Sequence, residues 1–125
     1  QAEKLMSSYQ HMQSSSAKVR HVLQQWPNQL AANKESVAEL LNTSPRTLTR
    51  RLQEENTQFS HLLRDVRMEK ARASLESFSI DMQELAHELG FADRRGFERA
   101  FKQWSDQTPS AYHRQWKKTQ VAVEA

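Results

Sequence analysis

The stretch 44–55, SPRTLTRRLQEE, predicts a short helix whose start, buried side and exposed side can all be read from its residues. Ser44 is a favourable N-cap, because its side-chain oxygen can accept a hydrogen bond from an unpaired amide of the first turn. Pro45 suits the first helical position, where no amide hydrogen is needed. With about 3.6 residues per turn, Leu48 and Leu52 fall on one side of the helix together with Pro45. This side is therefore expected to face a core.

The opposite side of the 44–55 helix carries side chains that suit contact with nucleic acid. Arginine can make paired hydrogen bonds to guanine in the major groove and otherwise binds phosphate. We interpret the stretch as a DNA recognition helix, and its predicted DNA-binding residues are Arg46, Thr49, Arg50 and Gln53.

The composition indicates an all-α chain that forms one domain or two very small lobes. There are 125 residues with only 2 Gly and 3 Pro, and helix-favouring residue types are frequent. The formal net charge is only +3, so the basic residues must be concentrated on particular faces if they are to bind an acidic partner.

Composition also sets expectations about compartment. The chain has no cysteine, which removes disulfides and thiolate metal sites and fits a reducing cytoplasm. No apolar run reaches the roughly 20 residues of a membrane-spanning helix, so we expect no membrane partner and a cytoplasmic location. Because the chain begins with Gln, we expect it to be a fragment or a processed form of a longer protein.

Polar stretches mark both ends of the chain, and cap residues mark the helices that precede the 44–55 helix. Residues 1–16 are rich in Ser and Gln and predict a linker or tail, and residues 117–125 predict a frayed C-terminal tail. A first helix is expected from Ala17 to the break at Pro27. The pattern Ser36-x-x-Glu39 predicts a capping box that opens the next helix.

Further helix starts are predicted in the C-terminal half. Asp81-x-x-Glu84 reads as a second capping box, and Asp93 as the N-cap of a helix that runs to about residue 104. Gly90 supplies the turn between these two helices, and a last helix is expected to begin at Thr108.

The longest predicted helix, 59–77, changes its apolar side halfway. One face consists of Phe59, Leu62, Leu63 and Val66, and a nearly opposite face consists of Met68, Ala71 and Leu75. Such a change indicates a bridge that packs on one lobe with each half. At about 1.5 Å per residue this helix is roughly 27 Å long.

The chain contains an internal repeat. At an offset of 48, Ala38 matches Ala86 and Asn42 matches Gly90. After a one-residue insertion, an offset of 49 gives the matched pairs Leu48–Phe97, Arg50–Arg99 and Leu52–Phe101. Each half thus reads as helix, sharp turn, helix, with a small Ala for close crossing and a turn residue that tolerates positive φ. This is the helix-turn-helix pattern.

The second repeat also has a basic exposed side, which carries Arg95, Arg99 and Lys102 with Glu98 beside them. The offset of 49 carries Arg46 onto Arg95, so both second helices present arginines at i and i+4. Outward arginines on one helix are usually an ordinary solvated surface, but their repetition favours DNA recognition. Major-groove segments on one side of B-DNA are about 34 Å apart, and the 59–77 helix with its lobes could span them.

Two stretches, SPRTLTRRLQEENTQFSHLLRDVRMEKA and ELAHELGFADRRGFERAFKQWSDQTPSAYHRQW, resemble the DNA-binding domain of the AraC/XylS family of bacterial transcription regulators. The second stretch is similar to the family's C-terminal signature in its GF, its F-x-R-A-F-K core and its T-P-S-x-Y. The resemblance covers about residues 17–116. It implies about seven helices, arranged as a first helix-turn-helix lobe (about 17–56), a linker helix (59–77) and a second lobe (about 79–116).

The resemblance also implies residue roles and partners. The base-reading positions would fall at Arg46, Thr49 and Arg50 in the first lobe and at Arg94, Arg95 and Arg99 in the second. The expected partners are double-stranded promoter DNA and RNA polymerase, with an effector or dimerisation partner bound through an N-terminal domain that this chain lacks.

Three positions depart from the family pattern. Asn42 and Asn56 stand where the family usually has Gly, and asparagine tolerates the same left-handed backbone. Gly96 lies inside the second recognition helix, where Gly costs about 0.5–1 kcal/mol relative to Ala.

Other functions fit the residues less well. Glu84-x-x-His87 resembles half of a di-iron site but has no second copy, so no metal site is predicted. The sequence has no phosphate-binding glycine loop or nucleophile motif, and we predict neither an enzyme nor a cofactor. The aromatic residues Phe97, Phe101, Trp104, Tyr112 and Trp116 have the spacing of a core.

The alternative from another functional class is a helical adaptor that binds an acidic protein surface. It would explain the basic faces, but it would not explain why turn residues that tolerate positive φ recur at matched positions of the two halves. Additional candidates for phosphate contact are His113, Arg114, Lys117 and Lys118.

Overall fold

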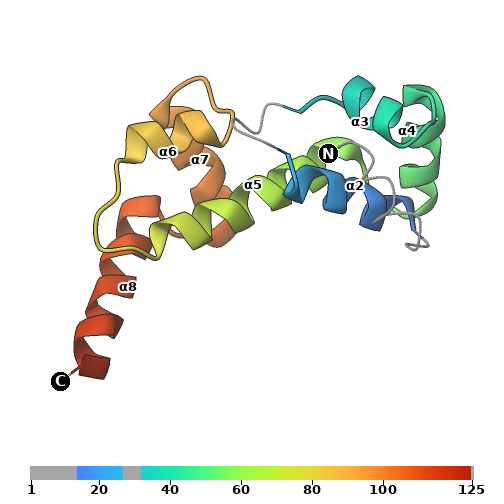
Figure 1. Ribbon diagram of the computed structural model, residues 1–125. Helices are drawn as coiled ribbons and strands as arrows, with labels where there is room; N and C mark the ends of the chain where they lie inside the picture. The colour runs from blue at the N-terminus through green and yellow to red at the C-terminus, as the bar shows by residue number, and fades with distance from the viewer. Residues whose placement is uncertain (1–13, 27–31, 125) are drawn as a thin grey trace. The chain divides into compact units, whose positions relative to one another are not determined.

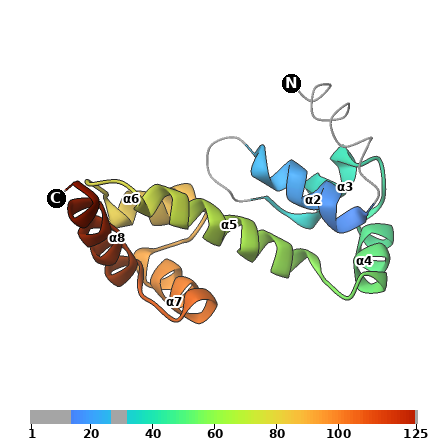
Figure 2. The same cartoon turned by 90° about the horizontal axis from the view of Figure 1, so that it is seen from below.

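The computed structural model describes residues 14–26 and 32–124, and within these ranges it contains seven helices and no strand (Figure 1). The expected all-α fold is confirmed. The chain divides into two compact units, residues 1–66 and 67–125. In two perpendicular views, α2, α3 and α4 gather on the first half of α5, and α6, α7 and α8 gather on its second half (Figure 2).

The first unit is built from α2 (Ser15–Gln24), α3 (Lys34–Leu40), α4 (Pro45–Glu54) and the first half of α5 (Phe59–Leu75). Their apolar sides enclose one small core. Its buried residues are Val19, Val22, Leu23, Ala32, Val37, Ala38, Leu48, Leu52, Leu62 and Val66. Leu48 and Leu52 are at most 1% exposed, so the predicted inner side of α4 is confirmed.

The local chemistry of α4 agrees with the sequence. The Ser44 side chain accepts a hydrogen bond from the amide of Thr47, and Pro45 occupies the first turn. Asn42 and Asn56, on either side of α4, adopt φ values of 57° and 60°. Asparagine is the residue besides glycine that most readily takes this left-handed conformation.

One cap in the first unit differs from the prediction. α3 begins at Lys34, and its N-cap is Asn33, whose side chain accepts from the amide of Ser36 at 2.8 Å. The expected Ser36-x-x-Glu39 capping box is therefore wrong by three positions, which places Ser36 inside the first turn. Asparagine and serine are about equally good N-caps, so the pattern alone did not separate them.

The second unit contains the second half of α5 with α6 (Met82–Glu88), α7 (Arg94–Ser105) and α8 (Pro109–Glu124). Its core has its own buried residues, which are Met68, Ala71, Leu75, Leu85, Ala86, Leu89, Phe97 and Phe101. The side chains of Asp81 and Asp93 cap α6 and α7 as predicted.

The turns of the two repeats have the same hydrogen bonds. The amide of Thr43 donates to the carbonyl of Ala38, and the amide of Phe91 donates to the carbonyl of Ala86, both at 3.0 Å. Both pairs are related by the offset of 48 found in the sequence. Gly90, the counterpart of Asn42, has a φ of 90°. The repeat is thus structural as well as sequential.

Helix α5 contributes to both cores through different faces. Leu62 and Val66 belong to the first core, whereas Met68 and Leu75 belong to the second. The change of apolar side predicted for this helix is confirmed. The helix ends at Leu75, two residues earlier than expected, and the hydroxyl of Ser77 donates to the carbonyl of Ser74 at that end.

Two predicted tail boundaries also differ from the structure. Helix α8 continues to Glu124, where the sequence predicted a frayed tail over 117–125. At the other end, the predicted tail 1–16 includes residues 14–16, which belong to the folded first unit, because Ser14 is the N-cap of α2 and Ser15 begins the helix. The remainder of that segment lies outside the described residues.

The start of α2 is fastened to the end of α4 by one carboxylate. The side chain of Glu55 accepts hydrogen bonds from the amides of Ser15 and Ser16 at 2.9 and 3.1 Å, and from the Ser16 hydroxyl at 2.6 Å. A negative charge is favourable here, because the amides at a helix N-terminus carry partial positive charge. Partial burial acts to raise the pKa of Glu55, but the hydrogen bonds from Ser16 and Ser15 outweigh it and lower the pKa below 4.5.

Glu55→Gln is expected to make the stability of the first unit less dependent on pH. Since the folded pKa of Glu55 is lowered, its contribution is present above the pKa of the unfolded chain and is lost as the pH falls through the folded pKa. A carboxylate at a partly exposed helix N-terminus contributes about 0.3–1 kcal/mol. Urea unfolding of both proteins should differ by this amount at pH 7 and converge in acid.

The matched control for that experiment is Glu39→Gln, an exposed glutamate on α3 of the same unit. At pH 7 its unfolding free energy should match that of the unmodified protein. A difference between Glu55→Gln and the unmodified protein that persisted unchanged into acid would contradict the charge-based account of this contact.

Candidate nucleic-acid interface

Helix α4 presents a polar face directed away from its core. Arg46, Arg50 and Gln53 are exposed and Thr49 is half-buried, whereas Leu48 on the other side is buried. The four predicted contact residues therefore lie on one accessible strip of a capped helix.

The two arginines of α4 differ in their surroundings. Arg50 forms an ion pair with Glu54 at 3.5 Å, and both side chains are more than 60% exposed. Such surface pairs contribute about 0–1 kcal/mol, so a phosphate or base can displace Glu54 at little cost. The side chain of Arg46 has no hydrogen bond or ion pair to any residue that the structure describes.

Sequence reasoning missed the role of Glu54 as the partner of Arg50. The signal was available, because oppositely charged residues at i and i+4 are neighbours on a helix surface. The pairing limits how strongly positive the C-terminal half of the α4 strip is before a ligand arrives.

Helix α7 presents a denser basic face. Arg94, Arg95, Arg99 and Lys102 are exposed, and Glu98 is half-buried beside them. Arg94 and Glu98 form an ion pair at 3.5 Å. Among the described residues, Arg95, Arg99 and Lys102 have no ion pair or side-chain hydrogen bond. These three cations therefore keep their full charge available.

The arrangement of α7 has the same relation to its core as that of α4. Phe97 and Phe101 are fully buried, at the positions matched to Leu48 and Leu52. Because the two helices belong to different units, all nine predicted DNA-binding residues are brought together as two separate sets, four on α4 and five on α7. Each set lies on the exposed side of the second helix of a helix-turn-helix pair.

Gly96 lies in the first turn of α7, where its amide donates to the Asp93 carboxylate at 2.8 Å. A Cβ atom added at this position would lie 3.4 Å from Oδ1 of Asp93 and 3.7 Å from Cδ1 of Phe91. These are ordinary van der Waals distances, and the φ of Gly96 is not positive. The glycine is therefore not required by the backbone of this helix.

Gly96→Ala is expected to raise the free energy of unfolding of the second unit by about 0.5–1 kcal/mol, because alanine loses less conformational freedom in a helix. Urea unfolding measures the change. The matched control is Gly90→Ala, which should lower stability by about 1–2 kcal/mol because this position needs a left-handed backbone. A loss of stability in Gly96→Ala would show that the first turn of α7 is crowded.

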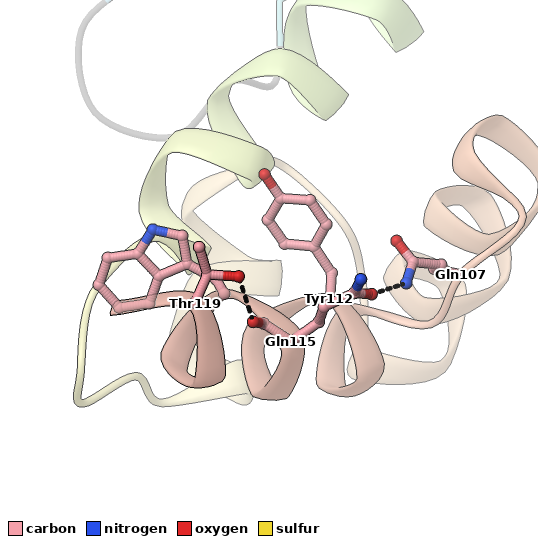
Figure 3. A pocket seen from close by; sticks show the side chains of 5 residues that line it. Gln107, Tyr112, Gln115 and Thr119 are labelled. Atoms are coloured by element: carbon pink, nitrogen blue, oxygen red, sulfur yellow. Dashed lines mark hydrogen bonds between the residues drawn. The ribbon is translucent and has the colours of Figure 1, made fainter. Parts of the chain in front are cut away.

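The described residues offer little for catalysis or metal binding. They contain no group of three His, Asp or Glu side chains that could hold a metal ion, and Glu84 and His87 are both exposed. A shallow pocket of about 280 Å³ is lined by Gln107, Tyr112, Gln115, Trp116 and Thr119 (Figure 3). The Gln107 side-chain amide donates a hydrogen bond to the Gln115 side chain at 3.0 Å, and the Thr119 hydroxyl donates to the Gln115 carbonyl at 3.1 Å (dashed lines in Figure 3). The polar groups of this pocket therefore bond mainly to one another.

Within residues 14–26 and 32–124, no helix is both long enough and apolar enough to cross a membrane.

The sequence matches a family of helix-turn-helix domains over residues 37–115. It is 33% identical over 112 residues to the ornithine utilization regulator of Pseudomonas aeruginosa, covering 90% of this chain and 33% of that protein. It is also 34% identical to the urease operon transcriptional activator of Escherichia coli over 78% of this chain and 32% of that protein. The chain thus spans about a third of the length of these curated relatives.

Among solved structures, the chain is similar to the C-terminal domain of AraT, a response regulator from Geobacillus stearothermophilus. The TM-score is 0.71 and the identity is 35%, with 84% of this chain and 88% of that chain covered.

Proposed function

This chain belongs to the AraC/XylS family of bacterial transcription regulators and carries the DNA-binding domain of that family, and on this premise we propose that it inserts α4 and α7 into adjacent major-groove segments of promoter DNA. The observation that supports this most directly is the repeated basic face. Arg46 and Arg50 on α4 correspond to Arg95 and Arg99 on α7, and all four are exposed. If these arginines served only solubility, their recurrence at matched positions of α4 and α7 would not be expected.

We propose distinct roles for the side chains of each strip. The arginines bind guanine edges or phosphates, since the guanidinium group can form two parallel hydrogen bonds. Thr49 and Gln53 on α4 add hydrogen bonds to bases or phosphates from the same strip. On α7, Lys102 contacts phosphate, and Glu98 orients Arg94 and accepts from cytosine.

Helix α5 has the proposed role of spacing the two recognition helices. It is one continuous helix of 17 residues that supplies buried side chains to both cores. At about 1.5 Å per residue it is roughly 25 Å long. We propose that a helix of this length serves as the spacer for reading major-groove segments about 34 Å apart.

We further propose that the complete regulator acts in the cytoplasm through RNA polymerase and responds to an effector or a dimerisation partner held by another domain. The chain covers only a third of regulators such as the ornithine utilization regulator, so its relatives have room for such a domain. Its own contribution is binding rather than catalysis, which fits a family of regulators and the small number of convergent titratable groups.

A gel-shift titration against genomic fragments at several salt concentrations tests the proposal. Specific fragments should be retained, and the binding constant should fall steeply with salt, because each neutralised phosphate releases a counterion. Arg64→Ala on α5 is a control that removes one exposed cation outside α4 and α7. Binding without salt dependence, or none at all, would instead favour a helical adaptor for an acidic protein.

A further inference from the structure

The second unit has an apolar groove with a basic rim that lies outside both recognition helices. Among the residues whose side chains are described, the large hydrophobic ones that stay exposed are Phe78, at 59%, and Val121, at 61%. Both line the same groove of about 410 Å³, together with Arg114, Lys117 and Lys118. Isolated exposed apolar residues are common, but two that line one basic groove make that groove a candidate binding surface.

The exposed Phe78 is held in place by α8. Three consecutive residues before α6 are each bound by one residue of α8. The Tyr112 hydroxyl donates to Glu76 at 2.6 Å, the Nε2–H of His113 donates to the Ser77 carbonyl at 2.7 Å, and the Phe78 ring packs on Trp116 with centroids 5.1 Å apart. An exposed aromatic ring that is already ordered loses little entropy when a partner covers it.

The first of these contacts persists across the physiological pH range. Partial burial, the hydrogen bond to Glu76 and the negative charge of that residue together raise the pKa of Tyr112 to about 12, against a smaller opposing effect of Arg72. The phenol therefore keeps its proton and continues to donate. This contact continues to hold the segment before Phe78 against α8.

The rim of the groove is positive. Arg114, Lys117 and Lys118 project from two successive turns of α8, and none has an ion pair or hydrogen bond through its side chain to a residue that the structure describes. The last turns of α8 extend beyond the other helices of this unit (Figure 1).

We propose that this groove docks an acidic segment of another protein that carries one large apolar side chain. The apolar residue covers Phe78 and Val121, and flanking carboxylates pair with Arg114, Lys117 and Lys118. DNA would use the three cations but would leave the two apolar side chains without a complement. The proposal extends beyond DNA recognition, because the groove contains no residue of α4 or α7.

Short synthetic peptides test the proposal on the intact chain. The probe has a central phenylalanine flanked by glutamates and aspartates. One comparison peptide replaces the phenylalanine by serine, and another replaces the acidic residues by lysines. Binding is followed by the indole N–H resonance of Trp116 in NMR spectra. The probe should bind saturably, and each comparison peptide should have an affinity at least about tenfold lower.

Two variants locate the binding. Val121→Asp changes a mostly exposed side chain, and Phe78→Ser removes the ring that packs on Trp116. Each should weaken probe binding by about tenfold or more, whereas affinity for a specific DNA fragment should be unchanged. Ser79→Ala, at the exposed neighbour of Phe78, is the control and should bind like the unmodified protein. Since Val121 contributes little packing, its variant remains informative if Phe78→Ser loses structure.

Several results would overturn the proposal. Equal affinity for the phenylalanine and serine peptides would show charge attraction without a docking groove. Loss of DNA affinity in Val121→Asp would assign the groove to DNA. A dimer that dissociates in Phe78→Ser would identify a second copy as the occupant, and vesicle binding that depends on Phe78 would identify an anionic membrane. Because DNA binding is measured separately, failure here leaves the proposed function intact.

Discussion

Phe101→Ala is expected to lower the free energy of unfolding of the second unit by about 3–5 kcal/mol, the usual cost of removing a buried aromatic side chain. Phe101 is fully buried, and its ring lies about 6 Å from three other rings, at 6.0 Å from Phe97, 6.1 Å from Trp104 and 5.9 Å from Tyr112. Its loss removes the centre of that cluster. A unit of this size has little stability to spare, so it should be largely unfolded at 37 °C.

Urea unfolding with amide NMR resonances from each unit would measure the effect where it occurs. Phe101→Leu is the matched control, because it keeps an apolar side chain and should cost much less. Leu52→Ala provides the equivalent change at the matched position of the first unit, with an expected cost of about 2–5 kcal/mol there. A cost below about 1 kcal/mol for Phe101→Ala would mean that the ring cluster is not the main source of stability.

The double substitution Arg95→Ala with Arg99→Ala is expected to abolish measurable preference for a specific promoter fragment. A base-reading arginine contributes about 1–3 kcal/mol, and the two residues are neighbours at i and i+4 on α7, so their effects need not add. Both are exposed and without ion pairs among the described residues, so no internal contact has to be broken before they bind DNA. Their removal should therefore appear directly in affinity.

Binding to the specific fragment and to random DNA must be compared at one salt concentration. Arg94→Ala is the matched control on the same helix, because Glu98 already compensates this arginine and a smaller loss is expected. Arg50→Ala on α4 should cost about 1–3 kcal/mol if Arg50 reads a base. Equal losses on specific and random DNA would assign the substituted arginines to phosphate contact.

Local chemistry explains why much of the fold could be predicted. The N-caps Ser44, Asp81 and Asp93 act within three residues of themselves, so their hydrogen bonds are encoded in the adjacent sequence. Asn42 and Asn56 likewise take the positive φ that their residue type tolerates. The outward arginine strips followed from helical periodicity, because the buried partners Leu48 and Phe97 define the opposite side.

Features that depend on distant residues were not predictable in the same way. Glu55 binds Ser15 and Ser16 across 39 or more positions, and no local pattern announces such a contact. Asp106 ends α7 in a left-handed conformation with a φ of 64°, and the adjacent sequence carried no signal for that conformation at this residue. The length of α8 was underestimated because a polar run, Lys117, Lys118, Thr119 and Gln120, interrupts the apolar residues before its last turn.

The separation of the two cores has a consequence for how such a chain can change over generations. Among the described residues, none belongs to both buried clusters, even though α5 supplies side chains to each. At matched positions the first core holds Leu48 and Leu52, whereas the second holds Phe97 and Phe101. A duplicated half can therefore exchange leucine for phenylalanine and refit its own neighbours while the other copy keeps its packing. Mutations can then change the basic strip of one half, and with it the DNA sequence which that half prefers, before the other half changes.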